Sequence, residues 1–163
     1  MNIKNILCPT DFSTSSHTAL MYASSLAKQY GAELHIVYVY EEAFGATEGS
    51  FPVYVQSSDI AADKKRLNGV APVLPDVSFQ RQFIIGHPPD RLLEYAKDND
   101  IDLIVMGTHG RTGLGRLLMG SVAEAVLRRA HCPVLTLKEP VGQRAKEGSS
   151  TTQMKGAVQG ASS

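Results

Sequence analysis

The stretch that decides the fold is GTHGRTGLGRLLMGS, residues 107–121, in which five of the fifteen residues are glycine. It follows an apolar run at residues 102–106 and leads into a helical pattern at residues 121–129. Glycines at the end of a strand let the backbone approach a ligand closely and turn its N–H groups inward. The N-terminus of the following helix favours negative charge, and Arg111 and Arg116 supply positive charge nearby. The stretch therefore predicts a phosphate cradle between a buried strand and a helix.

Two familiar phosphate motifs do not fit these glycines. Residues 110–117 have the glycine spacing of a P-loop, but Arg116 stands where the lysine belongs and Leu117 replaces the hydroxyl residue that holds magnesium. The pair Gly113 and Gly115 lacks the third glycine of the Rossmann fingerprint. The cradle is therefore of another kind.

Outward from this stretch, short apolar runs alternate with helical patterns along the chain. The runs expected to be strands are residues 5–9, 34–40, 77–85, 102–106 and 133–138, and the expected helices are residues 16–30, 57 or 58 to 67, 88–96 and 121–129. The alternation predicts an α/β fold with a single doubly wound, five-stranded parallel sheet, strand order 3-2-1-4-5, and helices on both faces. Ligands of such sheets bind beyond the carboxyl ends of the strands at the switch point, here between the first and fourth strands.

Length and composition exclude several classes of protein. A chain of 163 residues suits one domain, expected at residues 1–140, and the glycine- and serine-rich segment 141–163 is expected to be a low-complexity, disordered tail. Sixteen basic residues balance sixteen acidic ones, so we expect no nucleic-acid partner. No apolar run approaches the roughly 20 residues of a membrane span, and the N-terminus has no signal pattern. Cys8 and Cys132 are expected to be buried, reduced thiols, so a cytoplasmic location is predicted.

The spacing Gly107-x2-Gly110-x9-Gly120-Ser121 matches, at every defined position, the nucleotide-binding signature of ATP-binding universal stress proteins. The opening residues 6–13, ILCPTDFS, are similar to the first strand and turn of that family, and residues 131–137, HCPVLTL, resemble its last strand. The resemblance covers residues 1–138 in the right order. It implies a Rossmann-like fold of the adenine nucleotide alpha hydrolase type and a protein that acts in stress response.

The resemblance also implies a set of binding residues for ATP, with Mg²⁺ or Mn²⁺ held mainly by the phosphates. It assigns the phosphates to backbone N–H groups, the ribose and metal-bound phosphates to the first turn, and the adenine to the end of the second strand. The expected phosphate residues are Gly107, Gly110, Gly120, Ser121 and Val122, flanked by His109 and Arg111. The expected first-turn residues are Pro9, Thr10 and Asp11. The expected adenine neighbours are Val39 and Met106. The family forms homodimers through the last strand, which runs here from Pro133 to Lys138.

Several alternatives stay open at this stage. Asp11 could serve only as a helix N-cap, and the same alternative applies to Ser121. Ala123 stands where some ATP-binding relatives have a hydroxyl, which would weaken a phosphate or metal contact. No catalytic or metal-ligating residue is assigned, so hydrolysis is expected to be slow or absent.

Two other functions compete with ATP-dependent regulation. One is a non-enzymatic dimeric interaction module that does not use ATP. The other is a nucleotide-transferring enzyme whose substrate pocket would come from residues 43–75. The sequence also leaves open whether the nucleotide is ATP, AMP or a cyclic nucleotide.

Overall fold

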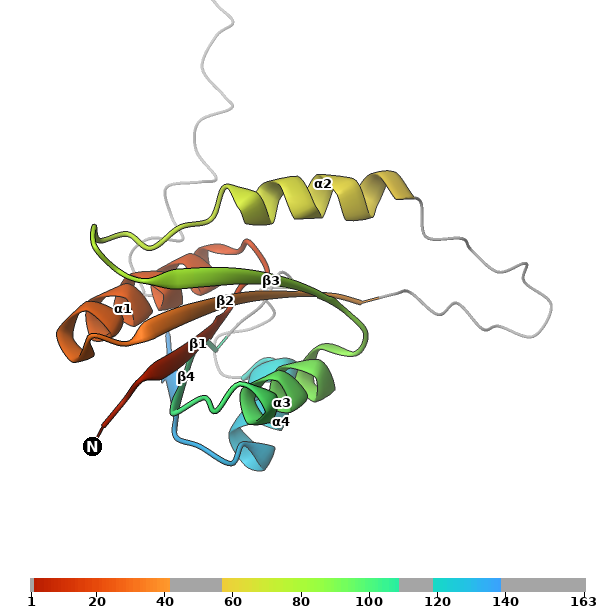
Figure 1. The fold of residues 1–163 in the computed structure, drawn as a ribbon. Coiled ribbons are helices and arrows are strands. Elements are labelled where there is room, and N and C mark those ends of the chain that lie inside the picture. Colours follow the sequence, from red (N-terminus) through yellow and green to blue (C-terminus); the bar gives the residue numbers. More distant parts are fainter. Residues whose placement is uncertain (1, 42–56, 109–118, 139–163) are drawn as a thin grey trace, which may run out of the picture.

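Five strands and four helices alternate along the chain, as the sequence predicts (Figure 1). The computed structural model describes residues 2–41, 57–108 and 119–138. The elements, in chain order, are β1 (Asn5–Pro9), α1 (Thr14–Tyr30), β2 (Glu33–Tyr40), α2 (Ser57–Asn68), β3 (Phe79–Ile85), α3 (Pro88–Asp98), β4 (Leu103–Gly107), α4 (Ser121–Arg129) and β5 (Val134–Leu137). The expected tail, 141–163, lies outside the described residues.

The strands form one parallel sheet in the order β3-β2-β1-β4-β5, which confirms the predicted topology. β1 lies at the centre, where Leu7 pairs with His35 of β2 on one side and with Ile104 of β4 on the other. The chain turns in opposite directions from β1, so the carboxyl ends of β1 and β4 mark the switch point of the sheet.

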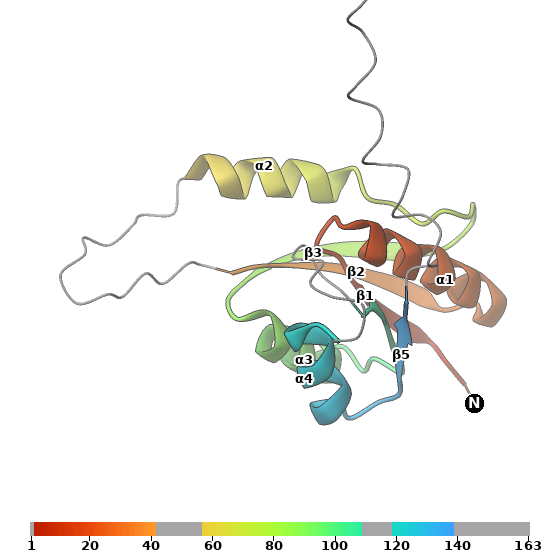
Figure 2. The same ribbon diagram turned by 180° about the vertical axis from the view of Figure 1, so that it is seen from behind.

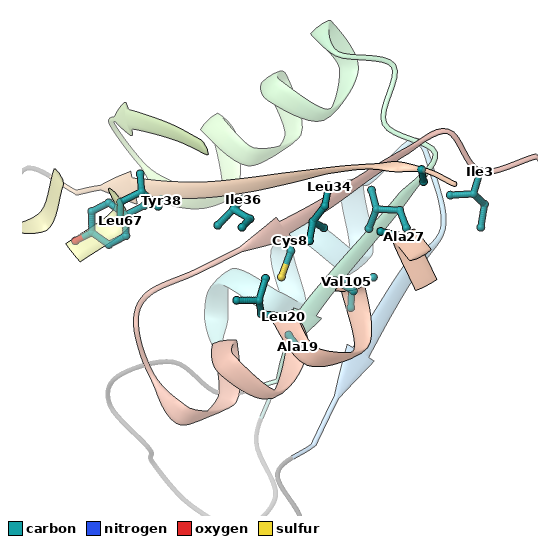
Figure 3. Close-up of a cluster of buried hydrophobic side chains, with 13 residues drawn as sticks. Ile3, Cys8, Ala19, Leu20, Ala27, Leu34, Ile36, Tyr38, Leu67 and Val105 are labelled. Atoms are coloured by element: carbon teal, nitrogen blue, oxygen red, sulfur yellow. The ribbon is translucent and has the colours of Figure 1, made fainter. Parts of the chain in front are cut away.

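Helices cover both faces of this sheet. α1 and α2 lie on one face, and α3 and α4 lie side by side on the other (Figures 1 and 2). Alternate residues of one strand therefore enter two cores: Cys8 packs under α1, whereas Leu7 packs under α3 and α4. Figure 3 shows the first core, in which Ile36 and Val105 also face α1. Because both faces are buried, the central strands are apolar without alternation.

Local capping explains where the first helix begins and ends. Ser13 is the N-cap of α1, and its Oγ accepts a hydrogen bond from the Ser16 amide at 3.2 Å. The helix therefore begins at Thr14, two residues before the predicted start. It ends at Gly31, which has the left-handed φ of 65° that the sequence predicts for a glycine at this point. Within the described parts of the chain, no helix has the length and apolar character needed to cross a membrane.

Candidate functional site

A cleft of about 530 Å³ opens at the carboxyl edge of the sheet, at the switch point between β1 and β4. Its walls come from the ends of three strands and from the first turns of α1, α3 and α4. The lining residues are Pro9, Thr10, Asp11, Ser16, Tyr38, Val39, Tyr40, Glu41, Pro88, Met106, Gly107, Thr108, Gly120, Ser121, Val122 and Ala123.

Most of the residues predicted from the sequence to form a site lie together around this cleft. They are Pro9, Thr10, Asp11, Val39, Met106, Gly107, Gly120, Ser121 and Val122. His109, Gly110 and Arg111 lie outside the described residues. The structure thus brings four separate predicted segments to one place, and the binding roles of these residues stay predictions.

The turn after β1 is fixed by hydrogen bonds from its own side chains. The Thr10 amide donates to the Val37 carbonyl at 2.9 Å, and the Phe12 amide donates to Thr10 Oγ1 at 3.1 Å. Asp11 Oδ1 accepts two hydrogen bonds from Ser13, one from the amide at 3.0 Å and one from Oγ at 2.5 Å. The interpretation of Asp11 as the N-cap is therefore wrong, because Ser13 caps α1 and Asp11 orients that cap.

The two ends of the glycine-rich stretch are joined at the other side of the cleft. The Thr108 amide donates to the Leu137 carbonyl at 2.9 Å, and the Gly120 amide donates to the Thr108 carbonyl at 2.7 Å. Thr108 and Gly120 therefore meet at the carboxyl edge of β4.

α4 begins at this junction with an open N-terminus. Gly120 is its N-cap, with an extended backbone (φ −62°, ψ 146°), and it has no side chain that could accept from the first-turn amides. Ser121 is the first helical residue and is exposed, so the alternative that it caps the helix is wrong. The first-turn amides and the helix dipole thus offer a site for negative charge beside the cleft.

Part of the cleft lining is apolar. Met106 is almost fully buried, while Val39 and Val122 are half-buried and pack in the core under α3 and α4. Pro88, from the first turn of α3, and Ala123, from α4, complete the wall. A planar, largely apolar ring fits such a wall, and backbone groups at the end of β2 could give it polar contacts.

Sequence reasoning missed several lining residues. Tyr40 and Glu41 end β2 at the same edge as the predicted residues, so the strand-end rule could have found them. Pro88 carried no such signal, because it reaches the cleft only through the packing of α3. Among the lining residues that the structure describes, the carboxylates are Asp11, in the turn predicted to lie near the metal-bound phosphates, and Glu41, directly after β2.

Gly107 makes a close contact that only glycine allows. A Cβ built on it would lie 2.2 Å from Ser15 Oγ and 3.0 Å from the Ser15 Cβ and carbonyl carbon. Ser15 is 2% exposed, and among the described residues its Oγ is the buried side-chain polar atom without a hydrogen-bond partner. The first turn of α1 therefore lies directly against the carboxyl end of β4.

The doubly wound sheet and the cleft at its switch point define the class, an α/β protein of the nucleotide-binding type. The sequence model of the universal stress protein family matches residues 2–138, and the chain belongs to that family. It is 38% identical over 144 residues to universal stress protein MJ0531 of Methanocaldococcus jannaschii, a match that covers 84% of this chain and 83% of the relative. It is 34% identical to universal stress protein A homolog 2 of Coxiella burnetii, with 84% and 96% covered.

Solved structures show the same fold. That of MJ0577 from Methanocaldococcus jannaschii matches with a TM-score of 0.74 and 28% identity, covering 86% of this chain and 99% of that one. A universal stress protein crystallised in complex with cAMP matches with a TM-score of 0.63 and 26% identity, covering 85% and 98%. The fold and the family agree with the topology predicted from the sequence.

Proposed function

We propose that this protein is a cytoplasmic stress-response regulator that binds ATP in the cleft at the switch point and hydrolyses it slowly or not at all. The observation that carries the proposal is the meeting of an open helix N-terminus with an apolar wall in one cleft of about 530 Å³. Pockets for small ligands have volumes of roughly 300–1,000 Å³. The related structure with bound cAMP supports an adenine nucleotide as the ligand class.

The two ends of the cleft suit the two ends of the nucleotide. The adenine would lie against Val39 and Met106, with the backbone of Val39 as its polar partner. The phosphates would lie at the N-terminus of α4, where Gly120, Ser121 and Val122 supply backbone N–H groups. Gly107 and Gly110, with His109 and Arg111 beside them, would complete the phosphate site from the other end of the glycine-rich stretch.

A divalent cation fits the chemistry of the described lining. Asp11 is acidic, and a bare triphosphate beside its carboxylate would be repelled. Mg²⁺ or Mn²⁺, held mainly by the phosphates, would relieve that repulsion and accept oxygen ligands. In this arrangement Asp11 lies near the ribose and the metal-bound phosphates, in the orientation fixed by Ser13.

The test is to denature freshly purified protein and to separate the released small molecules by anion exchange. We expect ATP in stoichiometric amount from the native protein and little from a Gly110→Ala/Gly120→Ala variant, which controls for carry-over. If the native protein is empty, titration with ATP, AMP and cAMP in the presence of Mg²⁺ decides among the ligands. A protein that binds none of them contradicts the proposal.

A second candidate, an interaction module that does not use ATP, is favoured by Ala123 and by the acidic residues of the described lining. Ala123 is buried at the start of α4 and offers no hydroxyl to a phosphate or metal. The melting temperature separates the two functions, because a ligand that binds the folded state raises it by mass action. No shift at millimolar Mg·ATP would favour the interaction module.

We also propose a homodimer through β5, from Pro133 to Lys138. β5 is an edge of the sheet, and Leu135 is 37% exposed on it. An edge strand with apolar side chains favours pairing with a second copy. Leu135→Glu is expected to give monomers in sedimentation velocity, whereas Ile85→Glu at the opposite edge strand, where Ile85 is 43% exposed, should not. A Leu135→Glu protein that remains dimeric would place the interface elsewhere.

A further inference from the structure

Four side chains from three separate segments close a ring of contacts beside the cleft. Phe12 follows β1, Tyr38 belongs to β2, and Asp63 and Arg66 lie one turn apart on α2. The Phe12 and Tyr38 rings stack with centroids 4.7 Å apart, and the Arg66 guanidinium lies 4.2 Å from the centroid of the Phe12 ring. The Tyr38 hydroxyl donates to Asp63 Oδ2 at 2.5 Å, and Asp63 Oδ1 pairs with Arg66 Nη1 at 3.5 Å. We call these four residues the α2 clamp.

The clamp holds a residue in an unfavourable backbone conformation. Phe12 has a φ of 64°. Among the other described residues, the non-glycine residues with a positive φ are Asp76 and Asp100. Aspartate adopts the left-handed region more readily than phenylalanine does. A bulky aromatic residue stays there only when the surrounding structure holds it. Stacking on Tyr38 and the cation above the ring add to the hydrogen bonds of the turn at this residue.

Phe12 is directly linked to residues that line the cleft. Asp11 precedes it in the chain, and the Phe12 amide donates to Thr10 Oγ1 at 3.1 Å. Tyr38 also belongs to the lining, while its hydroxyl contacts α2. None of the α2 residues described is among the lining residues, so α2 acts on the cleft through Phe12 and Tyr38.

We infer that Arg66 and Asp63 are positioning residues for the nucleotide: they hold Phe12 in its left-handed conformation and thereby fix Thr10 and Asp11 for binding. This inference rests on the proposed function. It adds a role for α2, whose Arg66 side chain is 55% exposed and open to contact from outside. Any partner or modification that draws Arg66 away from Phe12 would lower nucleotide affinity without entering the cleft.

The test measures Mg·ATP affinity for Arg66→Ala and for a matched control, Lys65→Ala, which removes a positive charge from the neighbouring exposed position of the same helix. Apparent affinity falls in proportion to the fraction of protein in the competent conformation. We expect a Kd about three- to ten-fold higher for Arg66→Ala and a change of less than about two-fold for Lys65→Ala. In a Phe12→Gly background, Arg66→Ala should have no further effect, because glycine adopts a positive φ without help.

A second readout works without nucleotide. The amides of Phe12, Ser13 and Ser16 donate to side chains of the turn, so their hydrogen exchange reports whether the turn is held. Arg66→Ala should speed their exchange while leaving that of Ile36, in the core of β2, unchanged.

The two readouts separate the inference from the proposed function. If the unmodified protein binds ATP but Arg66→Ala changes neither the Kd nor the exchange, the positioning role is wrong and the proposed function stands. If Lys65→Ala weakens binding as much as Arg66→Ala, the effect is one of charge, and the clamp is refuted. If the unmodified protein binds no ATP, the proposed function fails, and so does the claim that Arg66 and Asp63 affect nucleotide affinity. In that case, unchanged hydrogen exchange in Arg66→Ala would also refute the claim that they hold the turn.

Discussion

Replacing Gly107 by alanine tests how closely α1 and β4 must approach to form the cleft. The added Cβ would lie 2.2 Å from Ser15 Oγ, well inside van der Waals contact, and 3.0 Å from the Ser15 Cβ and carbonyl carbon. A hydroxyl can rotate away from such a contact, but a backbone carbon moves only with its helix. The substitution should therefore displace the first turn of α1 from the end of β4.

The size of the effect follows from two opposing contributions. Overpacking a well-packed site costs about 1–3 kcal/mol. Alanine also restricts the backbone of the unfolded chain, which stabilises the folded state by about 0.4–1 kcal/mol because Gly107 does not have a positive φ. We expect Gly107→Ala to lower the free energy of unfolding by about 1–2 kcal/mol, which corresponds to roughly 2–8 °C in Tm.

Ser15→Ala provides the matched partner for a double-mutant cycle. It removes the shortest contact and also a buried hydroxyl that has no hydrogen-bond partner among the described residues, an arrangement that costs about 1–3 kcal/mol. Ser15→Ala alone should raise the free energy of unfolding by about 1 kcal/mol. Gly107→Ala should then cost about 1 kcal/mol less in the Ser15→Ala background than in the unmodified protein.

The assay is urea unfolding of the four proteins followed by far-UV circular dichroism, since the chain has no tryptophan. The m-values should agree among the four, so that differences in midpoint report stability. A Gly107→Ala protein as stable as the unmodified one would refute the reasoning. Equal costs in the two backgrounds would show that the cost comes from the Cβ and carbonyl carbon of residue 15, which Ser15→Ala leaves in place.

Three further predictions concern the capping serine and two buried titratable groups. Ser13→Ala removes the N-cap of α1 and the partner of Asp11, and urea unfolding should show a loss of about 0.5–2 kcal/mol. Burial lowers the pKa of His35 below its ordinary value of 6.5, so as the pH falls the unfolded state takes up a proton before the folded state does. The free energy of unfolding should therefore fall as the pH drops below 6.5. His35→Gln should reduce the decrease in the urea midpoint between pH 7.5 and 5.5. Burial raises the pKa of the Cys8 thiol to about 12. In a Cys132→Ser variant, Cys8 should therefore react with a disulfide reagent at pH 8 only after unfolding. Rapid reaction of the folded variant would contradict this prediction.

The sheet could be predicted from the sequence because its central strands are buried on both faces. β1 and β4 appear as continuous apolar runs, and such runs between helical patterns leave few alternatives to a parallel sheet. Boundaries were less accurate. α1 begins earlier than expected because Ser13, one of several adjacent capping residues, takes the cap, and β3 begins at Phe79 rather than at residue 77.

The candidate site was predictable where residues follow the strands directly and not where they arrive through packing. Thr10, Val39 and Met106 lie at or directly after strand ends that topology brings to one edge. The approach of Pro88 to the cleft and of Arg66 to Phe12 depends on how α3 and α2 pack on the sheet. Hydrophobic periodicity in a single sequence does not determine those positions.

The contact between Gly107 and Ser15 changes what a mutation at this glycine can reveal. The glycine spacing suggests that residue 107 must be glycine so that a phosphate can approach its backbone. The structure supplies another requirement, since any side chain at this position would meet the first turn of α1. That turn carries Ser16, which lines the cleft, so a displaced α1 would also displace part of the cleft wall. Lost nucleotide binding in Gly107→Ala would therefore not distinguish a lost phosphate contact from a shifted helix. Gly120→Ala is the cleaner probe, because Gly120 has a φ of −62° that alanine also adopts, and it caps the helix whose N-terminus is proposed to hold the phosphates.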